Sequence, residues 1–175
     1  NVITIGKEAF EGCSSLDGIL KMSNQIETIG YASFVGCAKL RGNLVIPKSV
    51  KTIGESAFWK CASLEGLTIE EGCTASLEGT NFSDMGAFSG CTGLKGKIVI
   101  PSTFGDIGDR SFYKCTGIEG IEIKSNKITR IGNHAFYNCT NLKGDLIIPD
   151  NVITIGKEAF EGCSSLDGIL KMSNQ

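Results

Sequence analysis

The sequence predicts an α/β solenoid: right-handed coils of about 24 residues that share a parallel β-sheet, each with a short helical turn. Two repeats support this prediction. An A/S-F-x-x-C motif occurs seven times, usually after I-G-x-x, and the steps between its phenylalanines are 24, 24, 30, 24, 24 and 24 residues. In addition, residues 1–25 and 151–175 are identical. A period of this size indicates repeats that each form one coil of a stack.

A short strand is expected after each cysteine. The clearest apolar runs are residues 44–47 (L-V-I-P), 98–101 (I-V-I-P) and 146–149 (L-I-I-P). Their β-branched residues and their alternation are typical of strands, and the proline limits how far each strand extends. A second, weaker extended segment is expected at residues 50–53 and 128–131. Stacked at the coil period, the strands would form a parallel sheet along the axis.

The motif itself predicts a single helical turn, from Gly54 to Trp59 in one coil, with Ala57 and Phe58 facing inward. The residue before each cysteine is glycine in four coils, asparagine in one and lysine in two. Glycine and asparagine readily adopt the left-handed conformation that closes such a turn. We therefore expect a left-handed residue at this position.

Stacking would place the repeated aromatic and thiol side chains in an inward core ladder. Its members are Phe10, Phe34, Phe58, Phe88, Phe112, Phe136 and Phe160, with Cys13, Cys37, Cys61, Cys91, Cys115, Cys139 and Cys163. We expect free thiols, because adjacent coils lie about 4.8 Å apart whereas a disulfide needs its Cβ atoms at about 3.8 Å. A buried free cysteine acts as a small hydrophobic side chain.

Residues 1–175 are expected to form one continuous solenoid: a six-coil super-repeat of 150 residues and 25 residues of the next copy. The sequence begins and ends within a coil and carries no signal peptide or capping segment, which suggests a window from a longer array or fibre. One coil carries an insertion loop, residues 70–86, in place of V-x-x-I-G. Insertions in solenoids form loops on one face, often the face that makes contacts.

The composition excludes several classes of function. With 41% hydrophobic and 21% charged residues the chain resembles ordinary globular proteins, and its formal net charge is −2. A nucleic-acid or anionic-membrane partner would require a clustered basic excess, which is not present. No apolar run approaches the length of a membrane span.

The pattern C-x-x-L…I-x-I-P-x-x-V-x-x-I-G-x-x-A-F-x-x-C resembles the BspA-like, Treponema-type leucine-rich repeat. Nearly every consensus position occurs in residues 37–61: Cys37, Leu40, Leu44, Ile46, Pro47, Val50, Ile53, Gly54, Ala57, Phe58 and Cys61. The resemblance covers the whole chain. It implies a leucine-rich-repeat fold on surface proteins of bacteria and some parasitic protists, with roles in adhesion, aggregation and matrix binding, and no enzymatic activity. The chain departs from that pattern in its 24-residue coil, its insertion and its identical copy at 150 residues.

Catalytic and metal-binding patterns are missing from the sequence. His134 is the one histidine, and its position in the motif holds unrelated residues in other coils, so we expect an exposed side chain without a catalytic role. There is no C-x-x-C pair for zinc and no G-x-G-x-x-G for a phosphate. We expect no cofactor, no metal and no enzyme.

Two features are candidate interaction sites. The residue after each phenylalanine includes Trp59, Tyr113 and Tyr137, a column of aromatic side chains that either contacts a partner or lies flat over neighbouring coils. The insertion contains Cys73, the one cysteine outside the ladder. We expect it to be either a reactive thiol that can form an intermolecular link or simply a solvated thiol in a loop. Leu77 and Phe82 are its expected apolar anchors for a lateral contact.

These observations favour a structural extracellular protein: the repeating shaft of a surface filament, stalk or fibre that assembles with itself end to end and laterally. The alternative is a cell-surface adhesin that binds other surface or matrix proteins through the solenoid face. The identical super-repeat favours the first function, because a specific binding face does not require an identical copy.

Overall fold

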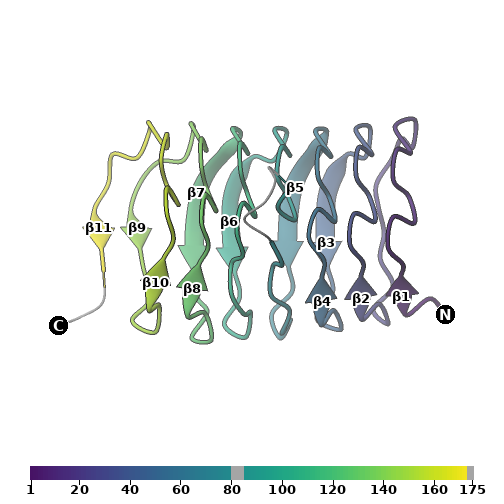
Figure 1. Cartoon of the computed structure of the whole chain (residues 1–175), viewed down its shortest axis with the longest axis horizontal. Helices are drawn as coiled ribbons and strands as arrows, with labels where there is room; N and C mark the ends of the chain where they lie inside the picture. The colour runs from purple at the N-terminus through teal and green to yellow at the C-terminus, as the bar shows by residue number, and fades with distance from the viewer. Residues whose placement is uncertain (80–84, 173–175) are drawn as a thin grey trace.

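The computed structural model describes residues 1–79 and 85–172 and forms a solenoid of seven stacked coils (Figure 1). We number the coils 1 to 7 by their phenylalanines, from Phe10 to Phe160. The near strands run upward and the far strands downward while the chain advances from right to left, so the path is right-handed (Figure 1). None of the described residues belongs to a helix long and apolar enough to cross a membrane.

One face of the solenoid carries the strands that follow the cysteines. They pair in parallel as β3 with β5, β6 with β7, and β9 with β11. Coils 3 and 5 have one residue fewer between the cysteine and the strand than coils 2 and 4. The strand register therefore shifts after Gly42 and Gly96, the bulge positions of coils 2 and 4, which have φ 76° and 68°. The strands are β3 (Gly42–Ile46), β5 (Leu64–Ile69), β6 (Gly96–Ile100), β7 (Ile118–Ile123), β9 (Leu146–Ile147) and β11 (Leu170–Lys171).

The opposite face carries the shorter strands before the motif. Parallel pairing orders them β1-β2-β4 and β10-β8, and single bridges connect Ile53, Leu77, Ile107 and Ile131 between these groups. The isoleucine of the I-G pair, or the Leu77 that replaces it, therefore pairs with its equivalent in each neighbouring coil, through all seven coils. The strands are β1 (Thr4–Ile5), β2 (Thr28–Ile29), β4 (Thr52–Ile53), β8 (Arg130–Ile131) and β10 (Thr154–Ile155).

The expected short helical turns are wrong: the motif folds as consecutive β-turns, and the described residues contain no helix. In coil 2 the Val35 amide bonds to the Ala32 carbonyl within the coil (3.2 Å), but the Phe34 amide bonds to Ala57 of the next coil (2.8 Å). Two residues, Ala32 and Gly36, have positive φ (52° and 68°). A helix would direct these amides along its own coil, whereas the positive φ values let alternate amides bond to the neighbouring coil.

The aromatic half of the core is a continuous ring stack. Successive phenylalanine centroids lie 5.1–5.5 Å apart with interplanar angles of 3–10°. The five rings from Phe34 to Phe136 are at most 1% exposed. Phe10 is 42% exposed and Phe160 is half-buried, because each has a coil on one side only.

The thiol half of the core is a column of hydrogen bonds. Each ladder thiol from Cys37 to Cys163 donates to the carbonyl of the phenylalanine in the preceding coil, at 3.0–3.2 Å; Cys73 is not part of this ladder. All the cysteines are free, and those from Cys37 onward are buried. Cys13 is exposed, unlike the other ladder cysteines, because the described residues place no coil on its outer side.

The insertion is shorter than the expected loop at residues 70–86. Leu77 bridges Ile53 and Ile107, so it occupies the isoleucine position of the motif, and the preceding residues follow the regular coil. Leu77 precedes Phe88 by 11 residues, whereas Ile53 precedes Phe58 by five. The six extra residues therefore lie between Leu77 and Phe88.

Candidate functional site

The residue after each phenylalanine lies on the outer ridge formed by the turns. Trp59, Tyr113 and Tyr137 are half-buried there, and the rings of Tyr113 and Tyr137 stack at 5.1 Å with an interplanar angle of 10°. Ser89 takes the same position in coil 4, between Trp59 and Tyr113, and is 1% exposed. The aromatic column is thus interrupted at coil 4.

Each aromatic residue beside this interruption is followed by a lysine that covers its ring. The Lys60 Nζ lies 4.4 Å from the centroid of Trp59, and the Lys114 Nζ lies 4.9 Å from that of Tyr113. Both lysines occupy the position before the cysteine and have positive φ, 59° and 56°. Four of the other coils have glycine at this position, and glycine adopts positive φ without a steric penalty.

These residues line an open groove on the ridge, which we call the coil-4 slot. Its volume is about 280 Å³. The slot is lined by Trp59, Lys60, Ser89, Gly90, Tyr113 and Lys114. It has two aromatic side chains, each with an ammonium group over its ring, on either side of a serine and a glycine.

His134 is not the exposed side chain that we expected. Its side chain is 16% exposed, its Nε2 lies 2.7 Å from Glu158 Oε2, and its ring edge meets Tyr137 at 5.7 Å between centroids. The equivalent residues in other coils also have positive φ, and two of them, Ala32 and Ser56, are buried. The position therefore belongs to the turn and is not generally exposed to solvent. Hydrogen bonds from Lys157 and then His134 lower the pKa of Glu158.

The buried thiols are poor nucleophiles. Burial, followed by the neighbouring Cys37, raises the pKa of Cys61 to about 12, and burial also raises the pKa of Cys139. Since the thiolate is the reactive form, the buried thiols of the ladder should be unreactive in the folded state. Cys139, five residues after His134 in the sequence, donates its proton to the Phe112 carbonyl at 3.2 Å.

The structure contradicts most of the site expected in the insertion. Cys73 is fully buried and its thiol donates to the Val50 carbonyl at 3.4 Å, so it is neither exposed nor solvated. Leu77 is 2% exposed and belongs to the core, so it cannot anchor a lateral contact. Phe82 lies outside the described residues. Both corrections follow from the regular path of the chain up to Leu77.

No three His, Cys, Asp or Glu side chains in residues 1–79 and 85–172 are grouped in a way that could hold a metal ion. The site that sequence reasoning missed is the coil-4 slot, although its signal is visible in the sequence. Phe58-Trp59-Lys60-Cys61 and Phe112-Tyr113-Lys114-Cys115 flank Phe88-Ser89-Gly90-Cys91. Aligning the coils by their phenylalanines brings the two aromatic–lysine pairs to either side of a serine–glycine pair.

One solved structure supports the fold, and two further leucine-rich repeat structures resemble the chain less closely. The crystal structure of a T. pallidum leucine-rich repeat protein is 26% identical and overlays with a TM-score of 0.75, over 95% of this chain and 72% of that chain. A Bacteroides ovatus leucine-rich repeat protein is 26% identical over 96% of this chain and 58% of that chain, with a TM-score of 0.38. A leucine-rich cell surface protein from Faecalibacterium prausnitzii is 17% identical over 95% of this chain and 69% of that chain, with a TM-score of 0.40.

A comparison with curated proteins finds no match. The family model of the BspA-type leucine-rich repeat region, in six copies, matches residues 1–86 and 84–174. This match extends over nearly the whole solenoid. The chain therefore belongs to the BspA-type leucine-rich repeat family.

Proposed function

We propose that this chain is a segment of an extracellular shaft, the repeating part of a surface filament, stalk or fibre. The observation that carries the proposal is the equivalence of the two identical segments. Glu8 and Glu158 both have φ 56°, and Gly12 and Gly162 have φ 72° and 74°. The same sequence thus has matching left-handed φ values six coils apart, which supports a unit that repeats in register.

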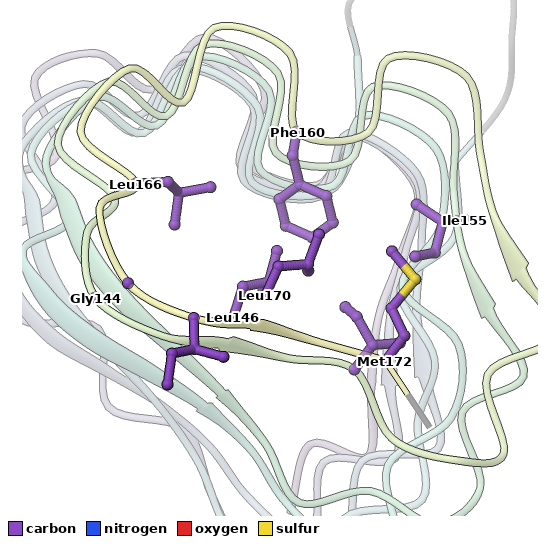
Figure 2. A pocket seen from close by; sticks show the side chains of 10 residues that line it. Gly144, Leu146, Ile155, Phe160, Leu166, Leu170 and Met172 are labelled. Atoms are coloured by element: carbon purple, nitrogen blue, oxygen red, sulfur yellow. The ribbon is translucent and has the colours of Figure 1, made fainter. Parts of the chain in front are cut away.

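The end of the stack at coil 7 supports the same proposal. Its open face is a pocket of about 340 Å³ into which Phe160, Leu166, Leu170 and Met172 point (Figure 2). Coil 1 has the same sequence, and there Phe10 stacks on Phe34 at 5.1 Å. The face at coil 7 therefore has the side chains that accept a coil like coil 2. Coil-on-coil stacking would then build the shaft without any specialised contact residue.

The extracellular location in the proposal rests on the family. BspA-type repeats are expected on surface proteins, and a long array of buried ladders suits a mechanical role, because each coil is stabilised mainly by its neighbours. The alternative, an adhesin, is favoured by one observation: Val45 and Ile147 are 36% and 56% exposed on the long-strand sheet face. Exposed apolar side chains on one face suit a protein partner.

Electron microscopy of the native protein separates the two functions. The shaft predicts uniform fibres whose width is that of one solenoid or a bundle of solenoids. Monodisperse short rods that bind a protein partner, and lose that binding when Val45 and Ile147 are replaced by Asp, would instead support the adhesin and overturn the shaft.

A further inference from the structure

One exposed residue per coil, at the edge where the chain enters the long-strand face, forms a column of alternating charge, which we call the charge column. It is negative in coils 1, 3, 5 and 7 and positive in coils 2, 4 and 6. Every member is exposed, and each is followed by a glycine, so the next residue has no side chain to shield it. The members are Asp17, Arg41, Glu65, Lys95, Glu119, Lys143 and Asp167.

The six-coil unit keeps this alternation intact. Because the number of coils in the unit is even, Lys143 of coil 6 is followed by Asp167 of coil 7, which is equivalent to Asp17. A unit with an odd number of coils would bring two like charges together at each boundary. The charge column can therefore continue through any number of copies.

Ion pairs within the chain leave the charge column available to a partner. Arg41 pairs with Asp17 at 2.8 Å and Lys143 with Glu119 at 3.7 Å, yet these four side chains remain 49–63% exposed. Coils 3 and 4 differ. The Lys95 amide donates to the Glu65 carbonyl at 3.0 Å, but the side chains of Glu65 and Lys95 form no ion pair with any described residue. The middle of the charge column thus carries two exposed charges that the fold does not use.

The pattern of charge selects the partner. Each six-coil unit of the charge column holds three positive and three negative residues, so the column has no net charge to attract a polymer or membrane of one sign. A matching partner must alternate in charge at the coil spacing of about 4.8 Å. A second copy of this chain has that spacing and that alternation.

We propose that the charge column joins two copies of the solenoid side by side, antiparallel, around a twofold axis that passes between coils 3 and 4. The contact is then isologous, and Glu65 of each copy faces Lys95 of the other. The further pairs are Arg41 with Glu119 and Asp17 with Lys143. An axis through coil 4 itself would overlap all seven coils but would bring like charges together. Each exposed pair contributes little alone, but all of them form together along the column.

This proposal deepens the shaft function, on which it rests for the length of the column, by naming the surface through which neighbouring shafts meet. Its test uses separate copies of the 175-residue chain in solution. Lateral pairing and fibre formation can therefore fail independently of each other.

Sedimentation velocity gives the first measurement. The unmodified protein should self-associate at about 0.01 M salt and dissociate at about 1 M, because the screening length falls from about 30 Å to about 3 Å. End-to-end stacking through the apolar coil faces would persist at high salt. The salt dependence therefore separates lateral pairing from stacking.

Charge reversal at the axis is the decisive experiment. Glu65→Lys and Lys95→Glu each place like charges opposite one another in the pair, so each variant alone should self-associate about 10-fold or more weakly. An equimolar mixture of the two variants should associate again, because opposite charges then face each other across the axis. A chain with both substitutions should self-associate like the unmodified protein. A purely intrachain role of these charges predicts no rescue on mixing.

Lys127→Glu is the matched control, because Lys127 is exposed outside the charge column and the change in net charge equals that of Lys95→Glu. It should associate like the unmodified protein. Circular dichroism checks the fold, and Arg41→Glu with Glu119→Lys repeats the test one coil further out if Glu65→Lys does not fold. A monomeric unmodified protein, association that ignores salt, full association of either single reversal, or a mixture that stays monomeric would each overturn the proposal. So would binding of heparin, in place of self-association, that Lys95→Glu abolishes.

Discussion

In the core, each junction between neighbouring coils includes one ring stack and one thiol hydrogen bond, in addition to the backbone hydrogen bonds between the coils. Phe58 stacks on Phe34 and Phe88 at 5.2 and 5.1 Å, and the Cys61 thiol donates to the Phe34 carbonyl at 3.1 Å. A thiol is a weak donor, but it adds a second hydrogen bond to a carbonyl that already accepts the Cys37 amide within its own coil (3.2 Å), and its small apolar body fills the space beside the rings. The core therefore combines packing and polar satisfaction at the same two positions in every coil.

Truncation of a ladder ring should reveal its two-sided packing. Phe58→Ala should lower the free energy of unfolding by about 3–5 kcal/mol, because Phe58 is fully buried and the substitution opens a cavity between two stacked rings. Phe10→Ala is the matched control, because Phe10 is 42% exposed and stacks on one ring only. It should cost clearly less. Denaturant unfolding followed by circular dichroism measures both, and equal losses would contradict the two-sided packing.

Thiol labelling should follow burial. In the isolated, folded 175-residue segment, Cys13 is exposed and should react with iodoacetamide, whereas Cys61 should react only after unfolding, because burial raises its pKa to about 12. Cys73 should be protected as well, since burial raises its pKa and its thiol is covered. Mass spectrometry of peptides from native and denatured samples gives the order. Labelling of Cys73 before Cys13 would show that the regular path assigned to residues 70–79 is wrong.

At the scale of the element, the sequence predicted the strands and the left-handed residue before the cysteine, but not the form of the turn. The spacing of A-F-x-x-C is compatible with a helical turn, and a glycine before the cysteine looks like a helix end. A second positive φ, at Ala32 and Ser56, is invisible in the sequence because these residues rarely adopt it. The neighbouring coil imposes it by accepting the alternate amide hydrogen bonds, which is a tertiary effect.

The backbones of neighbouring coils approach so closely at the I-G pair that only glycine should fit there without strain. A Cβ on Gly54 would lie 2.5 Å from the Tyr31 backbone nitrogen of the preceding coil, whereas a Cβ on Gly6 would meet nothing within 4 Å. Gly54→Ala should therefore destabilise the fold by about 1–3 kcal/mol through overpacking, and Gly6→Ala should be close to neutral. Neither position has positive φ, so the pair isolates the contact. Thermal unfolding of the two variants compares them, and a neutral Gly54→Ala would refute the close approach.

The ion pair between coils 6 and 7 should give stability that disappears in acid. The pKa of Glu158 is lowered from its ordinary value of 4.5 by Lys157 and then His134. A lowered folded-state pKa means that the contribution is complete above about pH 4.5 and is lost as the pH falls through the folded value. Glu158→Gln should flatten this part of the curve of melting temperature against pH.

Glu8→Gln is the control for the ion pair: Glu8 pairs with Lys7 as Glu158 pairs with Lys157, but its coil-2 neighbour in the turn is Ala32 instead of a histidine. It should change the curve less than Glu158→Gln does. If both variants flatten the curve equally, the cross-coil contact with His134 does not contribute.

At the scale of the whole molecule, periodicity alone was enough to predict a stack of parallel coils, because spacing fixes which residues meet in a solenoid. Lateral surfaces were harder to predict. Cys73 and Leu77 looked like loop residues because the usual V-x-x-I-G letters are absent, yet the bridges of Leu77 to Ile53 and Ile107 place them in the core. The coil-4 slot depends on three adjacent coils and becomes visible only when they are superposed.

The central claim is that six coils form a unit that repeats in register along one shaft. Helical reconstruction of native fibres by cryo-electron microscopy tests it most directly. Six coils at about 4.8 Å each predict that identical features, including the six-residue insertion, recur every 29 Å or so along a continuous sheet. A fibre without an axial repeat near that value, or one in which the sheet is interrupted between units, would contradict the claim.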